Sequence, residues 1–266
     1  MPELPEVETT RAGLAPHLLG RRVTGAVLRR PDLRWPIPYE IVDTLPGQRI
    51  DAVRRRAKYL LLDTDAGSAL LHLGMSGSLR VLPADTPLRD HDHVDLALDS
   101  GRVLRFNDPR RFGSVEYVSK APGWEHAFVR FSKLGPEPFS DLFTPESFFK
   151  ATRGKKVSIK ALLLSGLAVV GVGNIYACEA LFRSAIRPGK AAGRLSRAEV
   201  SALHAAVVAV LAEAIERGGS TLRNFQAIDG ELGHFQLHCD VYGREGQLCK
   251  RCGATVKRRV MNQRST

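Results

Sequence analysis

The sequence is short of cysteine, of acidic charge and of long apolar runs. Its four cysteines are too few for a disulfide framework in a chain of 266 residues. The longest apolar stretch, residues 161–172, contains two glycines and falls short of the roughly 20 residues that a transmembrane helix needs. The N-terminus lacks the basic, then apolar, then small-residue order of a secretory signal. We therefore expect a cytoplasmic protein with no membrane partner.

What the chain has in excess is positive charge. It carries 39 Lys and Arg against 28 Asp and Glu, a formal net charge of +11. An imbalance of this sign favours an extended polyanion such as nucleic acid as a partner. Hydrophobic and charged contents of 44% and 25% are ordinary for a globular protein, so the chain can build one large core or two smaller ones.

The first half of the sequence has the pattern of a β domain. A helix over about residues 5–19, ending at Gly20, precedes short apolar or alternating runs. Asp99-Ser100-Gly101 is a hairpin turn between the last two runs. Several close antiparallel strands indicate a sandwich or a flattened barrel. The predicted strands are 23–29, 49–63, 69–82, 93–99 and 102–106.

Beyond Gly135-Pro136-Glu137-Pro138 the periodicity becomes helical, over residues 144–151, 158–165, 174–184 and 196–217. Ser196 and Glu199 have the spacing of a capping box. Between the second and third helices, residues 166–173 hold three glycines and Asn174 follows at a predicted N-cap. Such a turn either brings backbone amides to a phosphate or simply reverses the chain. The net charge favours the phosphate.

The last segment combines a C-x-x-C pair with dense positive charge. Cys249 and Cys252 have the spacing of half a zinc site. Residues 244–266 hold seven Lys and Arg against one Glu, a net charge of +6. A charge run is usually a solvated tail, but the pair within it favours an ordered basic hairpin.

The opening letters MPELPE allow two interpretations. In one, Pro5 occupies the first turn of a helix and the glutamates complement its dipole. In the other, Met1 is removed, Pro2 becomes a terminal secondary amine and Glu3 lies beside it as an acid. The opening residues alone favour the first interpretation.

Seven blocks in order along nearly the whole chain carry a family resemblance: PELPEVETT, RRAKYLLL, HLGMSGSLR, DPRRFG, LGPEP, VVGVGNIYACEALF and VYGREGQLCKRCG. With them the sequence resembles the formamidopyrimidine-DNA glycosylases, bacterial repair enzymes for oxidised purines. The resemblance implies a multidomain α+β fold. Its parts are an N-terminal helix and β-sandwich (1–134), a helix–two-turn–helix domain (135–235) and a zinc-finger hairpin (236–266). It also implies a monomer, associated with the bacterial nucleoid, whose partner is double-stranded DNA with oxidised purines or abasic sites.

The resemblance assigns a catalytic set. Pro2 is the expected nucleophile, which requires that Met1 be removed, and Glu3 is the expected general acid and base. Lys58 is expected at a strand end near the lesion phosphate, and Arg264 completes the set from the finger. Glu6 either orients the terminus or only complements the helix dipole.

The resemblance also assigns DNA contacts. Met75, Arg110 and Phe112 match the trio that fills the space left by a flipped base, where a flexible apolar chain, a donor and an aromatic wedge suit the vacated stack. Residues 221–235 correspond to a loop over that base, with glycines that suit a mobile lid. The remaining expected contacts are His93, Lys160, Asn174 and Tyr242.

The finger departs from the family pattern. The family has two C-x-x-C pairs that bind zinc, whereas here only Cys249 and Cys252 are present and the sequence stops where a second pair is expected. Two thiolates do not fill a tetrahedral zinc site. His238 and Cys239 are weak substitutes. Either a longer natural chain supplies the second pair, which we prefer, or the finger closes without metal.

Two alternative functions stay open at this point. One is the endonuclease VIII branch, which prefers oxidised pyrimidines, although Leu4 and the Met75, Arg110 and Phe112 trio argue against it. The other is a noncatalytic DNA-binding protein, which the intact Pro2, Glu3 and Lys58 disfavour.

Overall fold

The computed structural model describes residues 2–121, 128–219 and 239–266. Within these ranges the chain forms two compact units. The first unit contains Pro2 and residues 6–132, and the second contains Glu3–Pro5 and the described residues from Lys133 onwards. The predicted lid at 221–235 and His238 lie outside the described residues.

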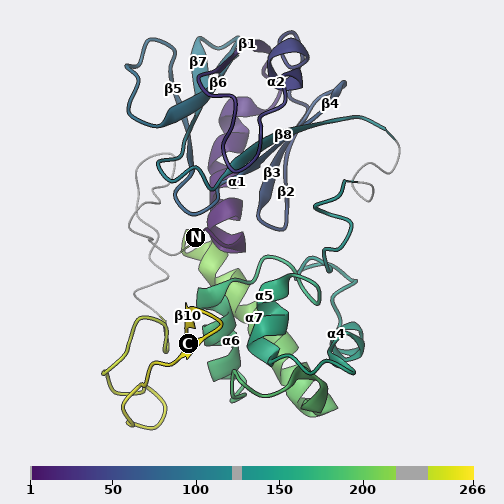
Figure 1. Ribbon diagram of the computed structural model, residues 1–266, viewed down its shortest axis with the longest axis vertical. Helices are drawn as coiled ribbons and strands as arrows, with labels where there is room; N and C mark the ends of the chain where they lie inside the picture. The colour runs from purple at the N-terminus through teal and green to yellow at the C-terminus, as the bar shows by residue number, and fades with distance from the viewer. Residues whose placement is uncertain (1, 122–127, 220–238) are drawn as a thin grey trace. The chain divides into compact units, whose positions relative to one another are not determined.

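The first unit is built on two antiparallel sheets of four strands (Figure 1). One sheet has the order β1-β6-β7-β5 and the other β2-β3-β4-β8. The predicted hairpin between β6 and β7 is confirmed, with Leu96 opposite Leu104. The strands are β1 (Val23–Leu28), β2 (Ala52–Arg56), β3 (Tyr59–Asp63), β4 (Gly67–His72), β5 (Ser78–Pro83), β6 (Asp92–Leu98), β7 (Arg102–Asn107) and β8 (Ser114–Ser119).

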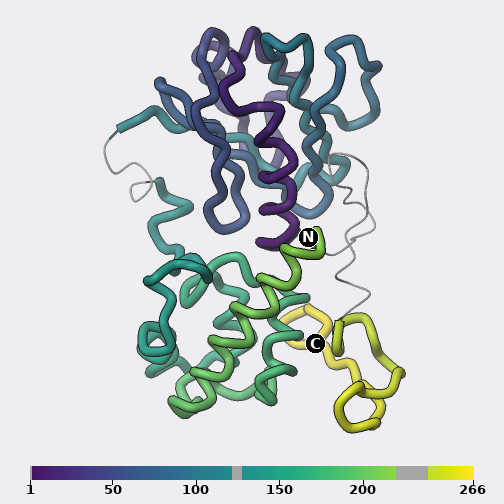
Figure 2. The backbone as a smooth tube through the Cα atoms, turned by 180° about the vertical axis from the view of Figure 1, so that it is seen from behind, coloured from purple at the N-terminus to yellow at the C-terminus, as the bar shows by residue number. Residues whose placement is uncertain are grey.

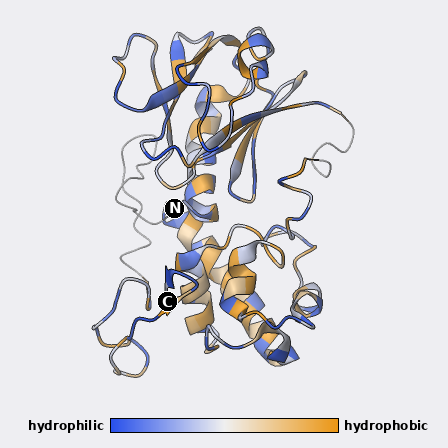
Figure 3. Ribbon diagram, in the orientation of Figure 1, coloured by the Kyte–Doolittle hydropathy of each residue, from blue (hydrophilic) through white to orange (hydrophobic). Residues whose placement is uncertain are grey.

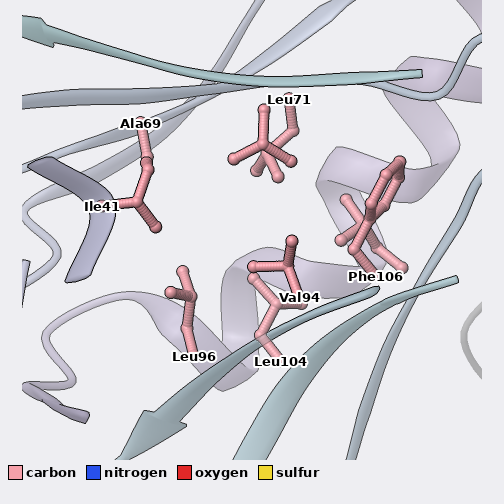
Figure 4. A pocket seen from close by; sticks show the side chains of 9 residues that line it. Ile41, Ala69, Leu71, Val94, Leu96, Leu104 and Phe106 are labelled. Carbon is pink, nitrogen blue, oxygen red and sulfur yellow. The ribbon is translucent and has the colours of Figure 1, made fainter. Parts of the chain in front are cut away.

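The two sheets face each other across an apolar core, so the sandwich is the correct alternative. Figure 4 shows Ala69 and Leu71 opposite Val94 and Leu104 around a small cavity that is apolar on every side. The helix α1 (Leu4–Leu18) adds its buried apolar side chains to the same core, and the short helix α2 (Glu40–Asp43) adds Ile41. Removal of this apolar surface from water is the main force that holds the sheets together.

The prediction for the first unit departs from the structure in four places. The run 49–63 is a hairpin of two strands with Ala57 and Lys58 in the turn, where Ala57 adopts a φ of 54°. No glycine or proline marks that turn. The run 69–82 is two strands of different sheets, because the chain turns at Gly74, whose φ is 61°. The strand β8 and the helix α2 were not predicted.

The second unit is helical, as predicted. It contains α4 (Pro145–Thr152), α5 (Ile159–Ser165), α6 (Asn174–Arg183), a 3₁₀ turn (Ala192–Arg194) and α7 (Arg197–Glu216). The capping box is confirmed, since the Glu199 amide donates to Ser196 Oγ at 3.2 Å and the Ser196 amide donates to Glu199 at 2.8 Å. The N-cap of α6 is Gly173, and Asn174 is the first helical residue.

Helix α7 is longer than the apolar stretch of residues 161–172. By length and composition alone it could cross a membrane, so the expectation that no segment is long enough was wrong. It packs against α6 and α4, its path through the unit can be followed in Figure 2, and its side chains Val200, Leu203 and Val207 are buried. The colouring of Figure 3 shows that many residues of α5, α6 and α7 are hydrophobic.

The chain closes with the hairpin of β9 (Val260–Met261) and β10 (Arg264–Ser265). Its two turn residues, Asn262 and Gln263, have φ of 49° and 59°, the conformation of a tight hairpin turn. This hairpin follows the basic residues 257–259 and lies beyond the C-x-x-C pair, so the predicted zinc-finger hairpin stays a prediction.

Candidate functional site

Glu3 is held at the N-terminus of α6. Its Oε2 accepts the Gly173 amide at 2.7 Å and its Oε1 accepts the Ile175 amide at 2.9 Å. The side chain is only 3% exposed. A helix N-terminus leaves amides unpaired and carries partial positive charge, so it stabilises a buried carboxylate. Glu3 thus caps a helix 170 residues away, in the place where Gly173 has no side chain to do so.

The residues beside Glu3 are fixed as well. The Leu4 amide donates to the Gly171 carbonyl at 3.1 Å, and a Cβ on Gly171 would lie 2.6 Å from Leu4 Cβ. Gly171 also has a φ of 82°, which favours glycine. Pro2 and Glu6 are buried. The predicted glycine turn therefore receives the opening residues of the chain, which sequence spacing did not indicate.

Lys58 lies in the turn between β2 and β3, directly before β3 begins at Tyr59, so it is next to a strand end as expected. It belongs to a cluster with His72, whose ring centroid is 4.7 Å from that of Tyr59. The Gly74 amide donates to His72 Nδ1 at 3.0 Å. Burial, and then the charge of Lys58, lower the pKa of His72 to about 4. His72 is therefore a neutral acceptor beside a cation, and the sequence patterns did not indicate it.

The structure brings Met75, Arg110 and Phe112 onto two adjoining loops of the first unit. The guanidinium of Arg110 lies 5.0 Å from the centre of the Phe112 ring. A Cβ on Gly74, next to Met75, would lie 2.6 Å from the Phe112 carbonyl oxygen. Met75 and Phe112 are 39% and 44% exposed. Exposed apolar side chains on tightly packed loops suit insertion into a base stack.

Asp108 ties these two loops together, and sequence reasoning missed it. Its carboxylate accepts Ser76 Oγ at 2.6 Å and the Gly113 amide at 2.7 Å. The Arg110 amide in turn donates to Ser76 Oγ at 3.1 Å. Asp108 is the first residue of the DPRRFG block and follows directly after β7. A single polar residue at the end of a strand forms no periodic pattern, so nothing local indicates its role.

His93 lies behind the Asp108 loop. Its Nε2 is 3.0 Å from the Asp108 carbonyl oxygen and donates to it. The side chain is buried, on the face of β6 opposite the core residues Val94 and Leu96. Its expected contact with DNA stays a prediction, and in this structure the ring supports the loop.

In the second unit, Lys160 and Asn174 hold the terminal hairpin. Lys160 Nζ donates to the Ser265 carbonyl at 2.9 Å and to Thr266 Oγ1 at 2.5 Å. Asn174 Nδ2 donates to the same Ser265 carbonyl at 3.0 Å. Lys160 is only 2% exposed, and its expected contact with the DNA backbone stays a prediction. A buried ammonium requires such partners.

Residues 239–266 are called the finger segment here. Tyr242 lies where this segment meets α6. Burial raises the pKa of Tyr242, and a hydrogen bond with the Asn174 side chain opposes that shift. The Tyr242 amide donates to Glu179 Oε1 at 2.8 Å. Arg264 is exposed on β10. Asn174 therefore contacts both the Tyr242 side chain and the strand that carries Arg264.

Of the four ligands that a zinc finger needs, the C-x-x-C pair supplies only Cys249 and Cys252. The amides of Arg251 and Cys252 donate to Cys249 Sγ and lower the pKa of that thiol, which suits a metal thiolate. Burial raises the pKa of Cys239 to about 12, which does not. Among the described residues no group of three or more His, Cys, Asp or Glu gathers to hold a metal. These residues do not complete a zinc site, and no chemical step is assigned to one.

Known proteins match this chain over both units. A family model for the formamidopyrimidine-DNA glycosylase N-terminal domain matches residues 1–115, and one for the H2TH domain of the same enzymes matches residues 134–226. Formamidopyrimidine-DNA glycosylases of Stenotrophomonas maltophilia and Xanthomonas euvesicatoria are 58% and 56% identical. Each comparison covers 100% of this chain and 97% of the relative.

Solved structures agree. The MutM (Fpg) protein of Thermus thermophilus is 41% identical with a TM-score of 0.90, over 100% of this chain and 96% of that one. A Lactococcus lactis Fpg mutant in complex with Fapy-dG-containing DNA is 32% identical with a TM-score of 0.91, over 100% and 97%. The fold, the two matched domains and the full-length identity lead to one conclusion: the chain belongs to the formamidopyrimidine-DNA glycosylase family of DNA repair enzymes.

Proposed function

We propose that this protein removes oxidised purines, such as 8-oxoguanine and formamidopyrimidines, from duplex DNA and then cleaves the strand by β,δ-elimination. The observation that carries the proposal is the buried Glu3 carboxylate, fixed by two helix amides one residue after Pro2. Membership of the family supports the glycosylase activity, and Lactococcus lactis Fpg has been solved with Fapy-dG-containing and abasic-site DNA.

The nucleophile in this mechanism is the nitrogen of Pro2 after removal of Met1. An α-amino group titrates near pH 8, so a useful fraction is neutral at physiological pH. The nitrogen forms a bond to C1′ while the bond from C1′ to the damaged base breaks, and the base leaves with a proton. The sugar ring opens as O4′ takes a proton, and an iminium remains between C1′ and Pro2.

The iminium accounts for strand cleavage. A secondary amine gives an iminium with no N–H to lose, so it stays an electron sink that acidifies the C2′ proton. Loss of that proton expels the 3′ phosphate, and a second elimination expels the 5′ phosphate. Each step transfers one proton and releases one leaving group, so no oxidant or metal is needed.

Glu3 is the proposed proton carrier for these steps. Its position at the start of α6 keeps the carboxylate fixed, and fixed geometry is what general acid–base catalysis requires. Lys58 is proposed to bind the lesion phosphate from the turn between β2 and β3.

The exposed trio is proposed to replace the flipped nucleotide. Extraction of a base costs a few kcal/mol of stacking and pairing. Met75 and Phe112 would restore apolar contact in the stack, and Arg110 would hydrogen-bond the orphaned partner base. Asn174, Tyr242 and Arg264 are proposed to bind phosphates and so fix the register of the duplex.

Borohydride trapping tests the proposal. The purified protein is incubated with an 8-oxoguanine duplex, reduced, and digested to locate any covalent DNA adduct by mass spectrometry. We expect an adduct on the Pro2 nitrogen and strand products that end in phosphate on both sides of the gap. A matched duplex with an oxidised pyrimidine measures preference between lesions.

Absence of an adduct would reject the mechanism, provided that the protein begins at Pro2 and binds the duplex. Such a protein would instead be a noncatalytic lesion-binding protein, and its affinity would fall steeply as salt rises. Faster excision of the pyrimidine lesion would reject the purine assignment while leaving the Pro2 chemistry intact.

A further inference from the structure

One buried carboxylate has no part in the chemistry above. Glu179 lies in the middle of α6 and is fully buried. Its Oε2 accepts the Asp240 amide at 2.7 Å, and its Oε1 accepts the Val241 and Tyr242 amides at 3.0 and 2.8 Å. Three successive backbone amides of the finger segment therefore converge on one side chain.

This arrangement holds the finger segment by charge. A buried carboxylate is costly unless hydrogen bonds satisfy it, and consecutive amides aimed at one point form a typical anion nest. Hydrogen bonds to an ionised acceptor are also stronger than neutral ones. Since the amides belong to the backbone, they fix the path of residues 240–242 whatever their side chains are.

A second contact on the same face supports this attachment. Arg183, one helical turn after Glu179, donates to Asp240 at 3.0 Å and to Glu213 of α7 at 2.7 Å. Lys250 Nζ donates to the Cys239 carbonyl at 2.9 Å. Arg183 thus adds a second contact of α6 with Asp240, and Lys250 holds Cys239 from within the segment.

Helix α6 links this attachment to the candidate active site. The amides at its N-terminus hold Glu3, and Asn174 in its first turn holds the Ser265 carbonyl of the hairpin. Glu179 follows Asn174 by about 7.5 Å along the helix axis. One rigid helix therefore joins the Glu3 carboxylate, the hairpin and the Tyr242 segment.

We propose that Glu179 is a positioning residue: it seats residues 239–242 on α6 so that Tyr242 and the hairpin meet the DNA backbone in register with Glu3. The inference rests on the proposed function, because the contacts that it positions are the proposed phosphate contacts. Glu179 itself touches neither substrate nor reacting atoms.

The test uses Glu179→Gln, which preserves shape and one acceptor oxygen but turns an NH₂ group toward the Asp240 amide. Cys239 is the reporter, since it is 1% exposed and is the first residue of the seated segment. The folded variant is treated with iodoacetamide and the labelled peptides are identified by mass spectrometry. We expect Cys239 to react about tenfold faster than in the unsubstituted protein, with Cys178 unchanged, from the loss of one charge-assisted bond.

The same variant is assayed on lesion DNA. We expect KM to rise about tenfold while kcat at saturating DNA changes little, because the proposed backbone contacts are weakened and the amides that hold Glu3 stay in place. Glu213→Gln is the matched control: it removes a partner of Arg183 and leaves the three amides in place. Glu179→Asp keeps the charge on a shorter side chain and is expected to lie between the two, which provides a reading if Glu179→Gln folds poorly.

Unchanged protection of Cys239 together with unchanged KM in Glu179→Gln would overturn the inference. So would an equal response in Glu213→Gln. If the unsubstituted protein showed no excision, the proposed function would fail instead, and the Cys239 labelling would still decide whether Glu179 seats the segment.

Discussion

Gly173→Ala offers a sharp test of whether the placement of Glu3 matters for catalysis. The φ of Gly173 is −116°, which alanine adopts without strain. The added Cβ would lie 2.5 Å from Glu3 Oε1 and 2.7 Å from Glu3 Cγ, whereas ordinary contact begins at 3.4 Å. The carboxylate must therefore move by about 1 Å, although its chemical identity is unchanged.

The displacement has two calculable effects. It weakens the bonds from the Gly173 and Ile175 amides, and hydrogen bonds to a charged group contribute about 1.5–3 kcal/mol each. We expect the free energy of unfolding to fall by about 3 kcal/mol. A misplacement of about 1 Å at a reacting group can cost on the order of 10²-fold in rate, so single-turnover excision should slow by that order.

The assay compares single-turnover excision with thermal unfolding at a temperature where the variant is folded. Gly189→Ala is the control in the same unit, because its Cβ would meet only the flexible end of Met261 at 3.4 Å. An unchanged excision rate in folded Gly173→Ala, with the expected loss of stability, would show that Glu3 acts only as a helix cap. Unchanged rate and stability together would refute the geometric argument itself.

Three further predictions concern other contacts. Asp108→Asn keeps one acceptor but loses the charge that binds Ser76 and the Gly113 amide, and should lower lesion excision more than binding of undamaged duplex, as measured by paired kinetic and affinity assays. The pKa of His72 is lowered to about 4 from about 6.5 in an unfolded chain, so the unfolded state takes up the proton first as pH falls. Stability should therefore decrease by about 3 kcal/mol between those pH values, and urea titrations should show a flatter profile for His72→Gln. Lys160→Met removes the bonds to Ser265 and Thr266 and should speed tryptic cleavage of the hairpin several-fold with little change in Tm, since an apolar replacement of a buried charge is often neutral for stability.

Much of the fold followed from local pattern. Alternating apolar residues predicted β6 and β7, and the Ser196 and Glu199 spacing predicted the start of α7, because these signals arise between neighbours in sequence. The failures have the same physical origin. The turn at Ala57 and Lys58 has neither glycine nor proline, so propensity gives no sign of it, and β8 is polar on one face and was passed over.

The candidate site divides along the same line. The sequence alone determined which residue types stand at Pro2, Glu3, Lys58 and the exposed trio, and through the order of its motifs it indicated the family. Tertiary structure decided what those residues touch: Glu3 caps a helix 170 residues away, and Lys160 is buried under a hairpin 105 residues away. Such pairings depend on how distant segments pack, since a helix end offers unpaired amides to whichever acceptor the fold brings to it. Local pattern marks Glu179 only as a polar residue on a helix, and its proposed positioning role rests on three backbone amides that the fold brings to it from 61 to 63 residues away.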